Sequence, residues 1–241
     1  MNSIYHNIKS AAKSKKKLLA VLIDPDKMKL EKVSDFINKA NLSIATHIFV
    51  GGSTVEEFTT EKVVIEIKKY TKLPVVLFPG DVTQLTEKAD GLLFLSLISG
   101  RNPEYLVGKH VDAASKLWRT QLEVIPTGYL LIDGKNETAV ARISNTSPMA
   151  TEHIQQIINT AKAGEFLGMK LIYLEAGSGA KQAVDTKIIS EVKKRLNIPL
   201  IVGGGIRTKQ QIENAYKSGA DMVVIGTAFE ENEHFFEELK K

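Results

Sequence analysis

Two glycine-rich segments near the end of the chain have the composition of phosphate-binding loops. Gly203-Gly204-Gly205 follows one apolar run, and Gly226-Thr227 follows the next. Glycines at such positions let backbone N–H groups approach an anion closely, and a following helix N-terminus adds partial positive charge. A single Gly-Gly pair is more often only a tight turn. Two such endings in succession favour a phosphate site, but they do not specify a reaction.

A carboxylate lies beside a third glycine-rich turn. The run Leu171–Glu175 continues into Gly177-Ser178-Gly179. Because side chains alternate along a strand, Tyr173 and Glu175 share the face opposite to Ile172. If Ile172 packs against helices, Glu175 points into the interior, where a carboxylate is costly to bury. A salt bridge to an interior lysine is the simpler explanation, but the adjacent phosphate-type loops favour a general base.

The first apolar run also ends in an acidic residue. The same alternation places Leu22 and Asp24 on the interior face, and the second run closes on Gly51–Thr54, which includes Ser53. A carboxylate and a hydroxyl, completed by substrate oxygens and water, suit Mg²⁺. Taken alone, Asp24-Pro25-Asp26 is more often a turn and helix cap. Zinc is not expected, because cysteine is absent and the histidines, at 6, 47, 110, 153 and 234, show no paired spacing.

Eight short apolar runs must position these residues, and most are followed by a helix-length amphipathic stretch. Such alternation indicates a parallel sheet covered on both faces, and eight units match an α/β fold of the (β/α)8 TIM-barrel type. A doubly wound open sheet is the alternative. In a barrel, the residues described above meet at the C-terminal mouth. The runs are Leu18–Asp24, His47–Gly52, Pro74–Gly80, Gly91–Leu97, Glu123–Ile132, Lys170–Gly177, Pro199–Gly205 and Met222–Thr227.

Two intervals depart from the regular alternation. Only residues 81–90 separate the third run from the fourth, which is too short for a helical crossover and predicts a missing or vestigial third helix. Residues 134–148 form a long polar stretch, which we interpret as a lid loop before a helix that begins near Thr151. The first gap leaves an apolar flank uncovered, with these residues nearby: Phe78, Pro79, Leu93, Leu95, Leu97 and Ile98.

Composition limits the class of protein. The chain has 241 residues, of which 43% are hydrophobic, and no linker-like tract, so we expect one domain over residues 1–241. Without cysteine, disulfides and thiolate nucleophiles are excluded, and a cytoplasmic location is the default. Lysine plus arginine exceeds aspartate plus glutamate by only 32 to 28, with no aromatic-studded basic stripe, so no nucleic-acid partner is expected. No apolar run is long enough to span a bilayer, which leaves at most peripheral membrane contact.

Together these motifs resemble the geranylgeranylglyceryl phosphate synthase family, which is related to the bacterial heptaprenylglyceryl phosphate synthases. Tyr173–Gly179 combined with Asp24-Pro25-Asp26 is the specific part of the resemblance, whereas the glycine endings are common to phosphate-binding barrels. The matching segments are Leu22–Lys27, Phe49–Ser53, Phe78–Gly80, Ser96–Pro103, Pro126–Tyr129, Tyr173–Gly179, Val202–Arg207 and Ile225–Thr227.

The resemblance implies an Mg²⁺-dependent prenyltransferase of ether-lipid biosynthesis that joins a prenyl diphosphate to the 3-hydroxyl of sn-glycerol 1-phosphate. Glu175 would take the hydroxyl proton, and Asp24 with Ser53 would hold Mg²⁺. The family also replaces the third barrel helix with a short irregular segment. The residues implied to hold glycerol phosphate are Tyr173, Leu174, Glu175, Ala176, Gly177, Ser178, Gly179, Gly204, Gly205, Gly226 and Thr227.

The prenyl donor is the least explicit feature of the sequence. On resemblance we expect geranylgeranyl diphosphate, with a heptaprenyl donor as the alternative, and we expect a homo-oligomer. Tyr105 and Trp118, which follow the fourth run, are candidates for the side chain that limits the chain length, although a single tryptophan more often packs its helix on the barrel. A phosphosugar isomerase or synthase, and a non-catalytic phosphoglycerol- or lipid-binding module, are the competing hypotheses.

Overall fold

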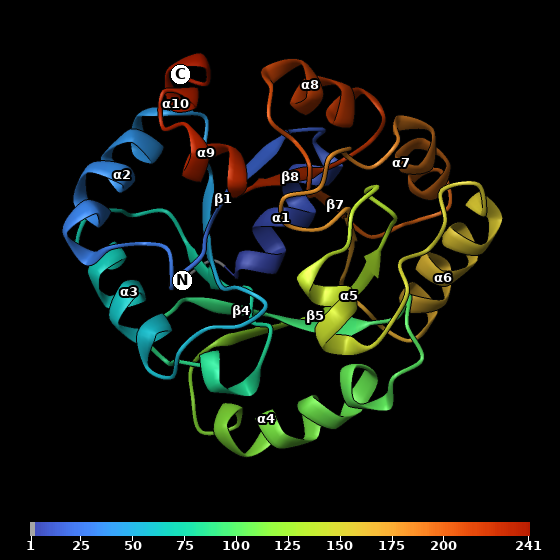
Figure 1. The fold of residues 1–241 in the computed structure, drawn as a ribbon, viewed down its shortest axis with the longest axis horizontal. Helices are drawn as coiled ribbons and strands as arrows, with labels where there is room; N and C mark the ends of the chain where they lie inside the picture. Colours follow the sequence, from blue (N-terminus) through green and yellow to red (C-terminus); the bar gives the residue numbers. More distant parts are fainter. Residues whose placement is uncertain (1–2) are drawn as a thin grey trace.

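Eight parallel strands close into a barrel in chain order in the computed structural model, which describes residues 3–241. Figure 1 shows the strands surrounded by helices, and the predicted TIM barrel is confirmed. The strands are β1 (Leu18–Ile23), β2 (His47–Val50), β3 (Val75–Leu77), β4 (Gly91–Leu97), β5 (Glu123–Leu131), β6 (Leu171–Glu175), β7 (Leu200–Gly203) and β8 (Met222–Ile225).

The helices that cover the barrel bury one apolar stripe each. In α2 (Leu30–Leu42), four apolar residues recur at helical spacing and are buried against the sheet: Val33, Phe36, Ile37 and Ala40. The covering helices are α2 (Leu30–Leu42), α3 (Thr59–Lys68), α4 (Lys109–Leu117), α6 (Ile154–Phe166), α7 (Thr186–Lys193) and α8 (Lys209–Lys217), followed by the short α9 (Thr227–Glu231) and α10 (Phe235–Glu238). In the part of the chain that the structure describes, no helix is long and apolar enough to cross a membrane.

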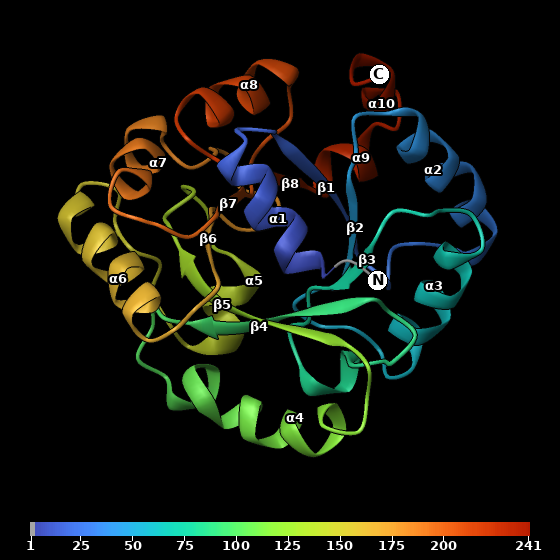
Figure 2. The same cartoon turned by 180° about the vertical axis from the view of Figure 1, so that it is seen from behind.

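Helix α1 (Ile4–Lys13) closes the N-terminal end of the barrel, and Figure 2 shows it lying across the strands. Ile4 and Ile8 are buried in the same cluster as the barrel interior. The Glu123 carboxylate accepts a hydrogen bond from the backbone N–H of Tyr5 at 2.9 Å and so offsets the positive end of the helix. Because α1 fills this end, a ligand reaches the interior from the opposite mouth.

Alternation along the strands separates two cores, as the sequence predicts. Ile172 and Leu174 of β6 lie in the core between the sheet and the helices. Leu171 and Tyr173 lie in the core inside the barrel. The inward face of β6 therefore leads to Glu175 at the mouth.

The helix that normally follows the third strand is replaced by one turn of 3₁₀ helix, η1 (Val82–Gln84). This confirms the predicted vestigial segment. β3 pairs with β4 only at Val76↔Gly91 and Leu77↔Leu92, whereas β4 pairs with β5 along its whole length. The C-terminal half of β4 therefore lacks a strand partner on the β3 side.

The connection between β5 and β6 differs from the prediction. Residues 134–148 are not only loop, because they include helix α5 (Ala139–Ser144), and α6 begins at Ile154 rather than near Thr151. The side chain of Thr138 caps α5 by accepting from the N–H of Ala141 at 3.2 Å. Asn145 ends the helix at φ 50°, in the left-handed region. Six residues are too few to show a clear helical period in the sequence.

Candidate active site

A cavity of about 370 Å³ opens at the C-terminal mouth of the barrel. The predicted site residues that line it are Asp24, Ser53, Tyr173, Glu175, Ser178, Gly204, Gly205, Gly226 and Thr227. Four others do not line it: Leu174 faces the helices, Ala176 and Gly177 are buried away from the cavity, and Gly179 is exposed to solvent outside it. Any role of these four in binding therefore rests on their backbone or on the loop shape they provide.

Glu175 is held at the inner wall of the cavity. It is only 5% exposed, and its Oε1 accepts a hydrogen bond from the N–H of Gly177 at 2.6 Å. Burial raises the pKa of Glu175 to about 7, although the Tyr173 hydroxyl and the Gly177 N–H act in the opposite direction. A carboxyl that titrates near neutrality is suited to accept a proton from a bound hydroxyl group.

Gly203, the last residue of β7, and Gly204 pack against this carboxylate. A Cβ on Gly203 would lie 2.2 Å from the Tyr173 Oη and 2.9 Å from the Glu175 Oε2. Gly204 adopts φ +80°, and a Cβ there would lie 2.2 Å from the Glu175 Oε1. This close approach of Gly203 was not predicted from the sequence. The available signal was a third consecutive glycine, one more than a phosphate-type turn requires.

Arg207 fixes the loops around the predicted phosphate site. Its Nη1 donates to the Ala180 carbonyl at 2.7 Å, and its Nε lies 3.6 Å from the Glu231 carboxylate on α9. The loop after β6 is therefore tied to the loop after β7 and to the first helix after β8. All three carry residues that the sequence assigns to phosphate binding.

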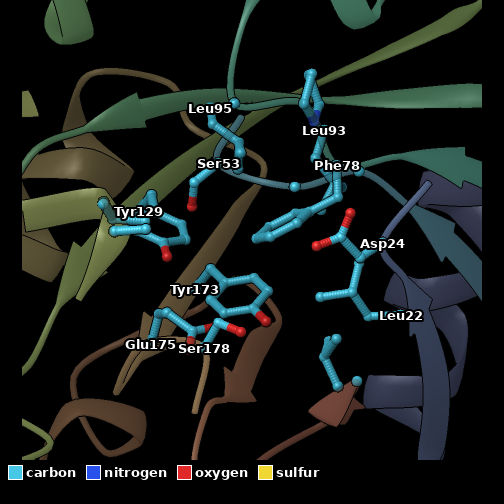
Figure 3. Close-up of a pocket in the computed structure, with 18 of the residues that line it drawn as sticks. Leu22, Asp24, Ser53, Phe78, Leu93, Leu95, Tyr129, Tyr173, Glu175 and Ser178 are labelled. Atoms are coloured by element: carbon cyan, nitrogen blue, oxygen red, sulfur yellow. The ribbon is translucent and has the colours of Figure 1, made fainter. Parts of the chain in front are cut away.

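Aromatic rings line the centre of the cavity. The ring centroids of Phe78 and Tyr173 are 5.3 Å apart, and those of Tyr129 and Tyr173 are 5.4 Å apart. Figure 3 shows the rings of Phe78 and Tyr173 between the carboxylates of Glu175 and Asp24. Aromatic faces attract cations, so this cluster can stabilise positive charge between the two carboxylates. The sequence did not single out Tyr129, although alternation along β5 places it inward.

Within the described residues, the Tyr173 hydroxyl is buried without a hydrogen-bond partner of standard geometry. It faces the Glu175 carboxylate, and its side chain lines the cavity. Buried hydroxyls are normally hydrogen-bonded, so one without a partner at a cavity is placed to bond a ligand.

Asp24 lies on the opposite side of the cavity from Glu175 (Figure 3). Its Oδ1 accepts from the N–H of Asp26 at 3.1 Å, and its Oδ2 lies 3.6 Å from the Lys27 Nζ. Asp26 instead accepts from the N–H of Glu56 and does not line the cavity. Of the two acidic residues in this motif, only Asp24 therefore lines the cavity.

The residues present fit a cation that is shared with a ligand. Over residues 3–241, no group of three His, Cys, Asp or Glu side chains could enclose a metal ion. Asp24 and Ser53 line the same cavity and offer one carboxylate and one hydroxyl. Mg²⁺ commonly keeps several waters and binds one or two carboxylates together with substrate phosphates. The site is thus compatible with Mg²⁺ bound against a phosphorylated ligand.

The cavity continues into an apolar groove where the barrel helix is missing. Phe78, Pro79, Leu93, Leu95 and Leu97 of the predicted flank line it, but Ile98 does not, because it packs beside Gly128 and Gly164. The outer part of the groove lies between η1 and α4, and its walls are Val82, Leu85, Leu92, Phe94, His110 and Ala113.

The two predicted length-limiting side chains lie in different environments. Tyr105 lines the groove, and its hydroxyl donates to the Ile143 carbonyl on α5 at 3.2 Å. Trp118 is 73% exposed at the C-terminal end of α4 and does not line the cavity. Trp118 was therefore a wrong candidate, because the residue that follows α4 points toward solvent rather than toward the groove.

Barrel strands, phosphate-type loops at the mouth and a long apolar groove define a class of protein that binds a phosphorylated ligand together with an apolar chain. The chain belongs to the PcrB family, whose model matches residues 12–241. It is 59% identical to the geranylgeranylglyceryl phosphate synthase of Zunongwangia profunda, covering 97% of this chain and 99% of the relative. It is 40% identical to the enzyme of that name from Pyrococcus furiosus, covering 94% and 90%.

Solved structures agree with this assignment. (S)-3-O-geranylgeranylglyceryl phosphate synthase from Thermoplasma acidophilum, solved in complex with its substrate sn-glycerol-1-phosphate, has a TM-score of 0.93 and 31% identity, covering 99% of this chain and 96% of that one. A mutant tryptophan synthase alpha-subunit from Pyrococcus furiosus has a TM-score of 0.55 and 13% identity, covering 92% and 94%. The second likeness shows the barrel fold alone.

Proposed function

We propose that this chain is a geranylgeranylglyceryl phosphate synthase, which joins geranylgeranyl diphosphate to the 3-hydroxyl of sn-glycerol 1-phosphate and releases diphosphate. One observation supports this most strongly: a buried carboxylate with a pKa of about 7 lies between phosphate-type loops and an apolar groove. The relatives named for this reaction, at up to 59% identity, give independent support.

The glycerol phosphate lies on the β6, β7 and β8 side of the mouth. Its phosphate accepts hydrogen bonds from the backbone at Gly204, Gly205, Gly226 and Thr227, with Ser178 close by. The Tyr173 hydroxyl, which lies beside Glu175 at the cavity, bonds the glycerol portion. This arrangement brings the 3-hydroxyl to Glu175, which removes its proton as the ether bond forms.

The prenyl diphosphate occupies the β1 and β2 side with its tail in the groove. Asp24 and Ser53 would hold Mg²⁺, which would supply charge neutralisation to the departing diphosphate. The allylic C–O bond breaks, and its electron pair leaves with the diphosphate. The glycerol oxygen forms the new C–O bond at the same carbon.

The aromatic cluster protects the reacting carbon. The faces of Phe78, Tyr129 and Tyr173 stabilise the positive charge that develops at the allylic centre. These rings and the groove also exclude water, which would otherwise capture the cation. Helix α5 adds Ala139, Val140 and Ile143 to the wall of the cavity.

A cytoplasmic location and a homo-oligomeric state stay predictions.

A partition assay tests this function. The protein is incubated with radiolabelled sn-glycerol 1-phosphate and Mg²⁺ in three separate reactions, which contain geranylgeranyl, farnesyl or heptaprenyl diphosphate. We expect label in the organic phase, with the highest kcat/KM for the geranylgeranyl donor. A preference for the heptaprenyl donor would support the alternative enzyme of the same reaction. No extractable label with any donor would contradict the proposal and favour a phosphosugar enzyme or a binding module.

Truncation of Tyr105 should relax donor selection. Tyr105→Ala removes a ring that lines the groove, so we expect relative kcat/KM to shift toward donors longer than geranylgeranyl, by roughly tenfold. Trp118→Ala is the matched control, because this aromatic side chain lies outside the cavity and its loss should not change the preference. The measurement is competition between donors in one reaction. An equal shift in both variants would exclude a local effect of the ring.

Substitution of Gly203 should disturb the base without removing it. In Gly203→Ala, the new methyl group would lie 2.2 Å from the Tyr173 hydroxyl and force Tyr173 and Glu175 to move. A displacement of about 1 Å can cost roughly 10²-fold in rate, so we expect kcat to fall by that order. Gly179→Ala is a useful comparison, because nothing lies within 4 Å of a Cβ there, although its φ of +71° adds strain. Unchanged kcat in Gly203→Ala would show that this close approach is not needed.

A further inference from the structure

The absence of the third barrel helix leaves a slot in the barrel wall. Beyond Leu77 and Leu92, β3 and β4 no longer pair, and the chain leaves the sheet at Phe78. Leu93 and Leu95 face the mouth, whereas Leu92 and Phe94 face outward, and all four line one continuous cavity. A chain that enters at the mouth can therefore leave the barrel beside β4.

An ion pair joins the two elements that border this slot. Lys109, the first residue of α4, contacts the carboxylate of Asp81, which caps η1. Both side chains line the cavity and are about one third exposed, at 28% and 36%. Burial alone would raise the pKa of Asp81, but the hydrogen bonds from Lys109 and Thr83 hold this pKa below its usual value. The pair is therefore ionised at neutral pH.

Two further contacts connect the pair to the groove. The Lys109 Nζ lies 5.1 Å from the centroid of the Tyr105 ring, a cation–π distance. Lys116, two turns later on α4, donates to the Val82 carbonyl of η1 at 3.3 Å. Helix α4 thus contacts η1 through both Lys109 and Lys116, and Lys109 also contacts the Tyr105 ring.

Charged groups at the border of an apolar groove carry a desolvation cost. Here the two charges connect elements that no intervening helix holds together. An ion pair at this place can limit the width of the slot while leaving its floor apolar.

We propose that the Asp81–Lys109 pair is a strap across the slot and a determinant of prenyl chain selection, acting by holding η1 and Tyr105 against the groove. This inference rests on the proposed function, because it assumes that a prenyl chain occupies the groove. With the strap intact, the groove favours the geranylgeranyl chain. Without it, η1 and Tyr105 move apart and longer chains are admitted.

Binding of unreactive donors tests the strap without turnover. The affinities of geranylgeranyl and heptaprenyl thiolodiphosphates are measured by calorimetry with Mg²⁺ present. Lys109→Met keeps the length and apolar stem of the side chain but removes the charge, and we expect the affinity ratio to shift toward the heptaprenyl analogue by about three- to fivefold. Asp81→Asn, which retains a side-chain oxygen to cap η1, should shift the ratio in the same direction.

The two variants together show whether the residues act as a pair. If they do, the double variant shifts the affinity ratio no further than Lys109→Met alone, because loss of Lys109 already leaves Asp81 without its partner. Lys68→Met is the matched control, since it breaks an ion pair with Asp90 outside the cavity. Additive shifts, or an equal shift in the control, would overturn the strap, as would unchanged ratios in all variants.

Turnover by the wild-type protein separates this inference from the proposed function. A shift in binding ratio without any prenylated product would support the strap and contradict the synthase activity. Normal turnover with an unchanged ratio would support the activity and overturn the strap. Failure of the wild type to bind either analogue would overturn both.

Discussion

Replacement of Glu175 by glutamine should lower kcat by roughly 10²- to 10⁴-fold, the usual contribution of a general base. Glutamine keeps the size of the side chain but cannot accept the proton of the 3-hydroxyl. The KM for glycerol phosphate should change little, because the phosphate loops remain intact. Steady-state kinetics with saturating geranylgeranyl diphosphate measures both values. A nearly normal kcat would return Glu175 to a structural role.

The pH dependence gives this prediction a second readout. Because burial raises the pKa of Glu175 to about 7, the free wild-type enzyme gains its base as the pH rises through that value. We therefore expect kcat/KM to rise with pH across neutrality and then level off. In Glu175→Gln this limb should disappear from the residual activity. A variant that keeps the same limb would show that another group produces it.

The free energy of unfolding should fall as the pH rises through neutrality, whereas kcat/KM should rise. The folded pKa of Glu175 lies above that of an ordinary glutamate, so the folded state binds more protons than the unfolded state between pH 4.5 and about 7. Stability therefore falls as the pH rises through this window, by about 3 kcal/mol at most for this group. Glu175→Gln removes the buried charge and should raise Tm at pH 8 but not at pH 4.

Replacement of Asp24 by alanine should reduce turnover by roughly 10³-fold or more, since the variant loses the carboxylate that we propose to hold Mg²⁺ at the diphosphate subsite. Glycerol phosphate should still bind, because its loops follow β6, β7 and β8. Calorimetry with sn-glycerol 1-phosphate checks this separation, and the Mg²⁺ dependence of thiolodiphosphate binding checks the assigned role. Comparable losses of affinity for both substrates would contradict the division into two subsites.

Asp26→Asn is the matched control for Asp24. Asp26 belongs to the same motif, but it accepts from the N–H of Glu56 and lies outside the cavity. Asparagine retains an oxygen for that hydrogen bond, so the variant should fold and turn over normally. A large loss in this variant would indicate that the motif acts through its charge and not through Asp24 alone.

The strand order and the inward faces could be predicted because each rests on a local pattern. Alternation placed Glu175 and Asp24 toward the barrel mouth, and the short interval at residues 81–90 excluded a helix. Both features appear in the structure. Local patterns succeed here because a parallel barrel requires the same geometry at every strand.

Other features could not be predicted because they depend on contacts between distant segments. The close approach of Gly203 to Glu175 depends on the pairing of β6 and β7. Trp118 was misjudged because the sequence does not fix how α4 is rotated on the barrel. Helix α5 is too short to show a period, and its C-terminal end depends on Asn102 and Tyr105, which donate to its carbonyls from the segment after β4.

The most direct test of the account is the identity of the product made from geranylgeranyl diphosphate and sn-glycerol 1-phosphate. The purified lipid is examined by mass spectrometry and NMR, and the released diphosphate is counted in the same reaction. We expect an ether at the glycerol C3, one diphosphate for each ether formed, and no such product from Glu175→Gln or Asp24→Ala on the same time scale. Prenyl alcohol as the only lipid product, or an ether formed equally well by both variants, would contradict it.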